Sequence, residues 1–389
     1  MKVLYLTGMY PTPAFPQKGI FCHEQVKALK KLGVDVDVVV PVTLYDREKP
    51  PKVWEYEGVR IRYVRFFKVP GVRMFEKTGT FLYWALRLSG IDFRKYDVLH
   101  ADAPLPAGYA AMRLSKKYGV PYIVHGHGLD VFSQKSYDGA KNCHKIVEVS
   151  AGVYKKADAI VGVSQKVLDC VQEKVDIARK GYVVFNGVDG EQFCPVEKTP
   201  AEKVVFISIG NLIPLKGHDY TLRAIKALVD KGYTNICLKL LGRGYLEQEL
   251  KDLAKELGIE QYVEFVGYVP YDDVRKALQQ SDVFVLPSWY EAFGCVYLEA
   301  MACGLPAIGC WGNGIDEVII PGKTGYLVEN KSLEQLVAAM EELLDEKIRQ
   351  QVGKNAREAV MEGYLWRHSA QALTQVYQNC MERGAQDGL

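Results

Sequence analysis

The feature that most constrains this 389-residue chain is a repeated unit: a short apolar run, a loop, and then a stretch whose apolar residues have helical spacing. The apolar runs fall at 2–7, 34–42, 98–102, 159–164, 204–209, 236–242 and 283–287. Strands that alternate with helices form parallel sheets, because each helix carries the chain back to the start of the next strand. We therefore predict an α/β fold of two Rossmann-like, doubly wound parallel-sheet domains. Ligands bind outside the carboxyl ends of such strands, so we expect the two domains to face a central cleft that holds the site.

Composition narrows the class of protein. With 48% hydrophobic and 25% charged residues the chain is globular, and its net charge of +2 argues against a nucleic-acid partner. Its nine cysteines include no Cys-x-x-Cys pair, which indicates neither a zinc site nor a disulfide framework. The N-terminal apolar run is too short for a signal peptide, and no run reaches the length of a membrane span. We therefore expect a cytoplasmic protein.

The two sets of repeats are separated by residues 190–203, GEQFCPVEKTPAEK, which have the composition of a linker. This break predicts an N-terminal domain at 1–193 and a C-terminal domain at 194–363. Each is long enough to bury its own core.

The stretch 283–306, VFVLPSWYEAFGCVYLEAMACGLP, carries the strongest functional signal. An apolar strand leads into a loop, and a helix follows whose first backbone N–H groups lack internal partners and favour an anion. Glu291 precedes this helix and Glu299 lies within it, eight positions later. A phosphate between them would leave one carboxylate for hydroxyl groups on each side, which is the layout of a nucleotide sugar. The alternative interpretation is two surface charges beside a capped helix.

The run from Glu291 to Glu299, followed by AMACGLP, resembles the Glu-x7-Glu signature of family-4 retaining glycosyltransferases, which have the GT-B fold. The resemblance covers almost the whole chain. It implies that a nucleotide-sugar donor binds at Glu291, Ala292, Phe293, Gly294, Cys295 and Glu299. Glu299 would hold the ribose hydroxyls and Glu291 those of the sugar. It also implies that a final helix at about 364–389 packs back on the N-terminal domain.

A second motif of the family concerns the diphosphate. Residues 210–217, GNLIPLKG, resemble Gly-Arg-Leu-x-x-x-Lys-Gly, in which arginine and lysine both hold the diphosphate. Lys216 matches the motif, and Asn211 occupies the position of the arginine. As a donor-binding residue, Asn211 can donate a hydrogen bond from its amide but cannot supply the arginine's charge. The phosphate cradle thus lacks one cation that the sequence does not identify.

Two further donor contacts are implied by resemblance. Gly19 follows the first strand and its loop, in the region that approaches the diphosphate; a helix-start glycine without a ligand is the alternative. Tyr268 and Val269 would line the pocket for the base, although a plain turn fits these residues equally well.

A histidine motif lies in the N-terminal half. Residues 127–131, HGLDV, resemble the family's His-Gly-x-Asp-Val, whose histidine lies near the sugar and diphosphate. A histidine at the end of a strand, beside glycines, can donate to a hydroxyl or a phosphate oxygen. His125 points to the same side two residues earlier, and we favour His127 over it; a capped loop histidine is the alternative.

No metal or other cofactor is expected. The pair Asp35 and Asp37 has the Asp-x-Asp form with which many other glycosyltransferases hold a divalent ion. Here the two residues begin a strand in simple alternation, so both point to one face as ordinary strand residues.

Residues 58–96 combine basic and aromatic side chains. The basic residues are Arg60, Arg62, Arg65, Lys68, Arg73, Lys77, Arg87, Arg94 and Lys95, and they mix with Phe66, Phe67, Phe75, Phe81, Tyr83 and Trp84. One interpretation is a surface that contacts the inner face of an anionic membrane to reach a lipid-linked acceptor. The other is ordinary packing, with the aromatic groups in the core and the basic groups in solvent.

Together these motifs predict an enzyme that transfers a sugar from a UDP- or GDP-sugar to a hydroxyl of a glycan or lipid-linked acceptor, with retention and without metal. The catalytic residues would be His127, Lys216 and Glu291. The motifs look most like those of bacterial enzymes of surface-polysaccharide synthesis, including teichuronic-acid-type polymers. Alternatives are a nucleotide-sugar epimerase or phosphorylase of the same fold, or a non-catalytic nucleotide-sugar-binding subunit.

Overall fold

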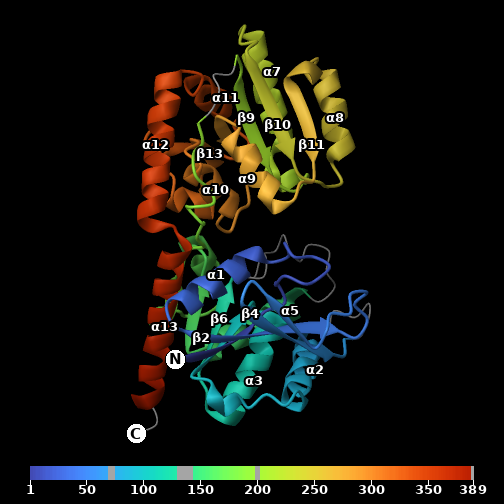
Figure 1. Ribbon diagram of the computed structural model, residues 1–389, viewed down its shortest axis with the longest axis vertical. Helices are drawn as coiled ribbons and strands as arrows, with labels where there is room; N and C mark the ends of the chain where they lie inside the picture. Colours follow the sequence, from blue (N-terminus) through green and yellow to red (C-terminus); the bar gives the residue numbers. More distant parts are fainter. Residues whose placement is uncertain (69–74, 129–142, 198–201, 387–389) are drawn as a thin grey trace. The chain divides into compact units, whose positions relative to one another are not determined.

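The computed structural model describes residues 1–68, 75–128, 143–197 and 202–386, and the chain divides into two compact units (Figure 1). The first unit comprises Met1–Asn186 and Trp366–Leu389, and the second comprises Gly187–Leu365. Each unit contains one sheet flanked by helices, which confirms the predicted α/β class. Among the described residues, no helix is long and apolar enough to cross a membrane.

The first unit is built on an eight-stranded sheet in the order β3-β4-β2-β1-β5-β6-β7-β8. Its strands are β1 Lys2–Leu6, β2 Asp35–Thr43, β3 Val53–Tyr56, β4 Val59–Phe66, β5 Val98–Asp102, β6 Tyr122–Gly126, β7 Ala159–Gly162 and β8 Gly181–Val183. All neighbours pair in parallel except β3 and β4, which form an antiparallel edge. The central strands are buried throughout, as is usual for a parallel sheet covered on both faces.

The second unit has a six-stranded, fully parallel sheet in the order β11-β10-β9-β12-β13-β14. Its strands are β9 Val204–Ile209, β10 Ile236–Leu241, β11 Val263–Gly267, β12 Val283–Val285, β13 Ala307–Cys310 and β14 Gly325–Val328. A core of aliphatic side chains from the strands and helices holds this unit together independently of the first.

The helices follow the strands as predicted. Those of the first unit are α1 Ile20–Lys31, α2 Phe75–Leu88, α3 Tyr109–Tyr118, α5 Cys143–Lys156, α6 Gln165–Gln172 and α13 Trp366–Gln386, with short turns η1 Phe93–Lys95 and η2 Pro104–Gly108. Those of the second are α7 His218–Asp230, α8 Glu247–Glu256, α9 Tyr271–Gln279, α10 Cys295–Ala302, α11 Leu333–Glu342 and α12 Glu346–Gly363, with η3 Pro214–Lys216, η4 Glu260–Tyr262 and η5 Gly314–Glu317.

The units divide at 186/187 and 365/366, whereas the sequence placed the boundaries at 193/194 and 363/364. The segment that follows Asn186 packs on the second unit. Val188 forms a bridge with Leu365, and Arg357 Nη1 donates to the carbonyl oxygen of Phe193 at 3.2 Å. Linker-like composition therefore begins several residues after the structural division. The helix α13 returns to the first unit and packs on α1, where Gln25 Nε2 donates to Ser369 Oγ at 3.3 Å.

Because the strands are parallel, the loops that follow them gather at one edge of each sheet. In the first unit this edge holds the end of β5, the residues after β6 and the loop that leads from β1 to α1. In the second unit it holds the loops after β9, β10, β11 and β12. The predicted site residues lie in these loops or in the elements directly after them.

Candidate active site

Lys216 and Glu291, 75 residues apart, meet at the carboxyl edge of the second sheet, where the Lys216 ammonium is paired with the Glu291 carboxylate. The side chains are only 18% and 12% exposed. Gly217 makes this approach possible. Its φ is +67°, and a Cβ there would lie 2.4 Å from the Pro287 carbonyl oxygen. The loop after β9 is therefore pressed against the end of β12, which brings the cation to the acid.

The backbone around Glu291 is fixed by a second loop. The Glu291 N–H donates to Asn313 Oδ1 at 2.8 Å, and Asn313 Nδ2 donates to the Ser288 carbonyl oxygen at 2.9 Å. Gly314 packs directly beneath, since a Cβ on it would lie 2.0 Å from the Ala292 carbonyl oxygen. Asn313 thus orients the acid, a role that the sequence did not assign to it because the two loops are distant along the chain.

The helix α10 begins beside this loop. Its N-cap, Gly294, has φ 90°, and a Cβ there would lie 2.7 Å from the Tyr297 ring. Phe293 is buried at 1% exposure and anchors the turn between Ala292 and Cys295. The structure therefore places the predicted phosphate-binding residues at a helix start, where partial positive charge favours an anion.

Glu299 lies within α10 and is buried, with 8% of the residue exposed. Burial raises the pKa of its carboxyl to about 7, although the hydrogen bond that it accepts from the Tyr271 hydroxyl at 2.8 Å lowers the pKa in part. This acid titrates close to neutrality, which is a property of many functional carboxylates.

Asn211 is exposed at the carboxyl end of β9, and the structure places Arg243 in the neighbouring loop. The register aligns Ile209 with Leu241, and the Leu212 N–H donates to the Arg243 carbonyl oxygen at 3.0 Å. This proximity requires the flanking glycines, since a Cβ on Gly244 would lie 2.1 Å from the Leu212 carbonyl oxygen. The sequence motifs do not point to Arg243, because the loops after β9 and β10 are brought together only by the pairing of these two strands.

Arg243 also reaches the predicted base pocket. Its guanidinium carbon lies 4.8 Å from the centroid of the Tyr268 ring, within range of a cation–π contact. Tyr268 is 57% exposed and Val269 is half-buried. An exposed aromatic ring supported by a cation can accept a stacking base, so the structure permits the predicted role of Tyr268.

In the first unit a buried carboxylate, Asp102, lies at the end of β5. It accepts hydrogen bonds at Oδ1 from His127 Nε2 at 2.8 Å and from the Tyr5 hydroxyl at 3.2 Å, and at Oδ2 from Cys22 Sγ at 3.0 Å. Burial alone would raise the pKa of Asp102, but the charge of His127 and hydrogen bonds from His100 and His127 hold it well below its usual range. Asp102 is therefore an ionised partner for His127.

The structure separates the two histidines of the predicted pair. His125 is fully buried in β6, whereas the His127 side chain is 18% exposed, and their rings lie 4.3 Å apart. Burial lowers the pKa of His125 well below its usual value, so this ring is neutral. Only His127 joins Asp102 and the solvent-accessible edge, which supports the preference for His127 over His125.

At position 19, the N-cap of α1, the packing of the backbone requires a glycine. Its φ is 63°, and a Cβ there would lie 2.2 Å from the Met9 carbonyl oxygen. The loop after β1 is thus folded tightly on the start of α1. This packing accounts for a glycine at position 19 whether or not a diphosphate approaches it.

Two groups in the described part of the chain have the composition of a metal site: Cys22, Asp102 and His127, and His100, Asp102 and His125, with ligand atoms within 4.8 Å of one another. Burial raises the pKa of the Cys22 thiol well above its usual value, so it serves Asp102 as a hydrogen-bond donor rather than as a thiolate ligand. The Asp35 and Asp37 carboxylates lie 2.7 and 3.4 Å from Lys2 Nζ. These arrangements favour hydrogen-bonded and ion-paired carboxylates over ligands.

Comparison with known proteins assigns the class. The model of glycosyltransferase family 4 matches residues 19–192, and the model of glycosyl transferases group 1 matches residues 191–359. The N-acetyl-alpha-D-glucosaminyl L-malate synthase of Bacillus anthracis is 31% identical over 69% of this chain and 71% of that protein. TuaC of Bacillus subtilis, a glycosyltransferase named for teichuronic acid biosynthesis, is 27% identical over 97% of this chain and 98% of that protein.

A solved structure extends the comparison to the fold. HepE of Anabaena, in complex with UDP and glucose, matches with a TM-score of 0.74 at 17% identity, covering 96% of this chain and 98% of that one. The fold is therefore that of glycosyltransferases with two Rossmann-like domains, the GT-B fold. The chain belongs to glycosyltransferase family 4, with a group 1 domain in its second unit.

Proposed function

We propose that this glycosyltransferase moves a sugar from a UDP- or GDP-sugar to a hydroxyl of a glycan or lipid-linked acceptor, with retention of configuration and without metal, in cell-surface polysaccharide synthesis. The observation that carries the proposal is the pairing of Lys216 with Glu291 beside the start of α10. A cytoplasmic location is part of the proposal, and it is consistent with the described cysteines being thiols rather than disulfides.

The donor diphosphate is the leaving group, so the barrier falls most when the charge that develops on it is stabilised. Lys216 supplies one cation, and the N–H groups at Phe293 and Gly294 supply partial charge at the start of α10. Arg243 supplies the second cation that Asn211 cannot provide. When the diphosphate binds Lys216, the Glu291 carboxylate becomes available to the sugar hydroxyls.

The remaining donor contacts follow the same logic. Ionised Glu299 accepts hydrogen bonds from the ribose hydroxyls, and Tyr271 keeps its carboxylate oriented through their 2.8 Å hydrogen bond. The base stacks near Tyr268 and Val269. His127, held by Asp102 at Nε2, lies near the sugar and diphosphate in this proposal, and the Gly19 region approaches the diphosphate, as the resemblance implies.

Support for this donor comes from the relatives. HepE is solved with UDP and glucose, and TuaC is named for the synthesis of a surface polymer. For the reaction course we adopt attack from the face of the leaving group, with a phosphate oxygen accepting the acceptor's proton, as the resemblance to the family implies.

The test begins with the donor. A panel of nucleotide sugars is screened for protection against thermal unfolding; a ligand at 100 times its Kd adds about 2.7 kcal/mol to the stability of the folded state. With the donor so identified, nucleotide release is followed in the presence of candidate acceptors for Lys216→Ala, Glu291→Ala and Glu299→Ala. Lys226→Ala is the control, because this lysine forms only an exposed pair with Asp230 on α7.

We expect Lys216→Ala to lose roughly 100- to 1000-fold in rate, the range seen when one charge-stabilising donor is removed. The Lys226→Ala control should keep the full rate. Full activity in all three site variants would refute the assignment. Conversion of the donor without any acceptor would instead indicate an epimerase, and donor binding without turnover would indicate a binding subunit.

A further inference from the structure

The first unit contains an apolar groove between α2 and β4, separate from the candidate active site. It encloses about 730 Å³. It is lined by residues from β4, from α2 and from the segments on either side of β3 and β4, among them Leu44, Pro50, Phe66, Phe67, Ala85 and Leu88. A groove of this volume and lining can accommodate part of a hydrocarbon chain.

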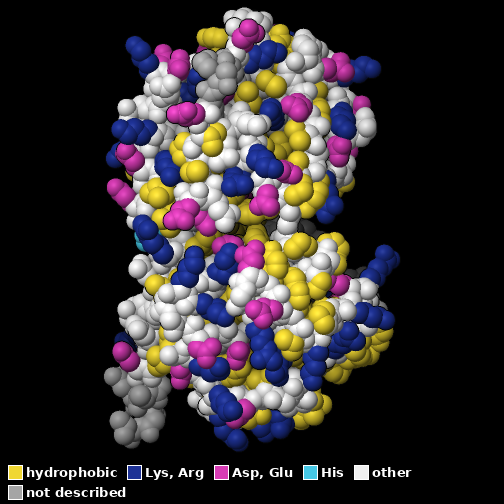
Figure 2. Space-filling view, viewed as in Figure 1, with side chains coloured by type: hydrophobic (Ala, Val, Ile, Leu, Met, Phe, Trp, Pro, Cys, Tyr) yellow, Lys and Arg dark blue, Asp and Glu magenta, His cyan; other side chains and the backbone are white. Residues whose placement is uncertain are grey.

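Large apolar side chains at this groove are exposed. Of its lining residues Leu88 is 84% exposed, Leu44 54% and Phe67 40%, and Trp84, next to the lining residue Ala85 on α2, is 47% exposed. Trp84 and Leu88 lie four residues apart on α2, and so share one face of the helix. Figure 2 shows hydrophobic side chains beside Lys and Arg over this part of the first unit. A contiguous exposed patch of this kind marks an interaction surface.

These exposures separate the two interpretations of residues 58–96. Tyr83 and Phe66 are buried, at 6% and 5% exposure, as ordinary packing predicts. Phe67, Trp84 and Leu88 are not, although burial would be favourable for each of them. Core packing therefore explains Tyr83 and Phe66, whereas Phe67, Trp84 and Leu88 face solvent. Arg73, Phe75 and Lys77 belong to the same sequence, and their side chains lie outside the described residues.

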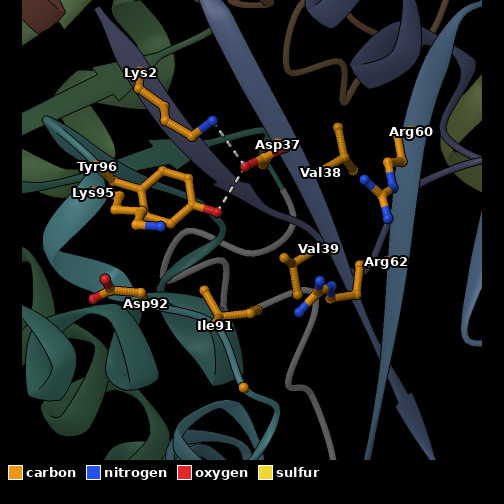
Figure 3. Close-up of a pocket in the computed structure, with 11 residues that line it drawn as sticks. Lys2, Asp37, Val38, Val39, Arg60, Arg62, Ile91, Asp92, Lys95 and Tyr96 are labelled. Atoms are coloured by element: carbon orange, nitrogen blue, oxygen red, sulfur yellow. Dashed lines mark hydrogen bonds and ion pairs between the residues drawn. The ribbon is translucent and has the colours of Figure 1, made fainter.

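The charged residues that line the groove are all cationic. Among its described lining residues Lys52, Arg62 and Arg65 are cationic, and no carboxylate occurs. Arg62 also lines an adjoining pocket of about 300 Å³ that includes Arg60 and Lys95 (Figure 3). The pocket also has two carboxylates: Asp37 pairs with Lys2 and accepts a hydrogen bond from the Tyr96 hydroxyl at 2.8 Å, and Asp92 accepts one from the Arg94 N–H at 3.3 Å. Basic groups thus continue from the groove along β4.

We infer that this face of α2 and β4 docks on an anionic lipid bilayer, with an acyl chain in the groove and lipid phosphates at Lys52 and Arg62. Exposed Trp, Phe and Leu beside Lys and Arg are the composition of a surface that lies in the membrane interface. The cations at the groove favour a partner with negative headgroups. The inference rests on the proposed function in one respect: docking on the bilayer would bring a lipid-linked acceptor to the enzyme.

The test is cosedimentation of the full-length protein with vesicles of phosphatidylcholine alone or of phosphatidylglycerol. The variants are Leu88→Ser, Leu44→Ser and Lys52→Glu, all at exposed positions, so that their folding can be checked by thermal unfolding. Matched controls in the second unit are Ile320→Ser, at a residue 52% exposed, and Lys354→Glu, at a side chain 71% exposed. Nucleotide-sugar protection is measured on the same samples.

We expect binding to phosphatidylglycerol vesicles that weakens with salt, and little binding to phosphatidylcholine. Lys52→Glu should weaken it at least about fivefold, the factor that corresponds to roughly 1 kcal/mol per basic residue near an anionic surface. Leu88→Ser should weaken it similarly, and both controls should bind like the wild type. All of these variants should keep their protection by nucleotide sugar, because none lies at the donor residues.

Absence of vesicle binding in the wild-type protein, or equal loss in the controls, would overturn the inference. So would a lipid-independent dimer that Leu88→Ser dissociates, since the patch would then be an interface between copies. The two proposals fail separately: loss of donor protection in the wild-type protein with intact vesicle binding contradicts the proposed function alone.

Discussion

Asp102 and His127 are 25 residues apart in the sequence and are joined by a 2.8 Å hydrogen bond at His127 Nε2. The contact arises because β5 and β6 are parallel neighbours, with Asp102 paired to His125 across the sheet. A buried, ionised carboxylate keeps a proton on Nε2 and orients the ring, as the third group of a catalytic triad orients its histidine. Asp102 is therefore a positioning residue for the proposed role of His127.

The first prediction concerns this pair. Asp102→Asn keeps the shape of the side chain and removes its charge, so we expect a rate roughly 100-fold lower, within the range for acid–base groups. The pH profile of kcat should also move, because the pKa of His127 loses a stabilising anion. Steady-state rates against pH measure both effects. Asp176→Asn, on an exposed loop residue, is the control, and an unchanged profile in Asp102→Asn would contradict the positioning role.

The second prediction concerns the missing cation. If Arg243 takes the place of the arginine that is absent at 211, Arg243→Ala should weaken donor binding by roughly 10- to 100-fold, the value of a hydrogen bond to a charged group. Adding Asn211→Arg in that variant should restore much of the loss. Calorimetric titration of the donor measures both. Arg223→Ala on α7 is the control, and failure of the second substitution to rescue binding would speak against the exchange of roles.

The third prediction follows from Glu299. Its pKa is raised to about 7 by burial, and only its ionised form can accept hydrogen bonds from the two ribose hydroxyls at both carboxylate oxygens. Donor affinity should therefore rise with pH, by about tenfold per pH unit well below that pKa, and level off above it. Tyr271→Phe removes a hydrogen bond that lowers the pKa, and should shift this rise to higher pH. Titrations at several pH values detect the shift.

The free energy of unfolding depends on pH in the opposite direction to donor affinity. Because the folded pKa of Glu299 lies above its ordinary value of 4.5, folding favours the protonated form. This contribution to the free energy of unfolding is complete below pH 4.5 and is lost as the pH rises through about 7. Glu299→Gln should remove the dependence from both stability and donor affinity, whereas Glu249→Gln on the exposed face of α8 should keep both. Parallel pH curves for Glu299→Gln and the wild type would exclude Glu299 as their source.

The fourth prediction is that the reaction is independent of divalent ions. Lys216, Arg243 and the start of α10 supply the positive charge that a metal supplies elsewhere, so EDTA should leave the rate of nucleotide release unchanged. A metal-dependent transferase treated in the same way is the control. Loss of activity that Mg²⁺ or Mn²⁺ restores would direct attention to Asp102 and its neighbours as ligands.

Local pattern was enough to predict most of the secondary structure and the parallel class of both sheets. Buried parallel strands are continuous apolar runs, and their helices have amphipathic spacing, so each signal lies within one short segment. The edge strand β3, Val53–Tyr56, was missed because alternate residues face solvent and its partner in β4 is antiparallel. Its existence depends on a neighbour rather than on its own composition.

The sequence by itself determined the family and pointed to Lys216, Glu291 and Glu299, because these residues belong to short motifs whose spacing a helix or loop preserves. Their functional roles stay predictions. Only the tertiary structure decided that Lys216 pairs with Glu291, that Arg243 lies beside Asn211 and that Asp102 holds His127. The reason is physical: these contacts are set by the register of parallel strands and by glycines that allow close approach, and neither is encoded within any one segment.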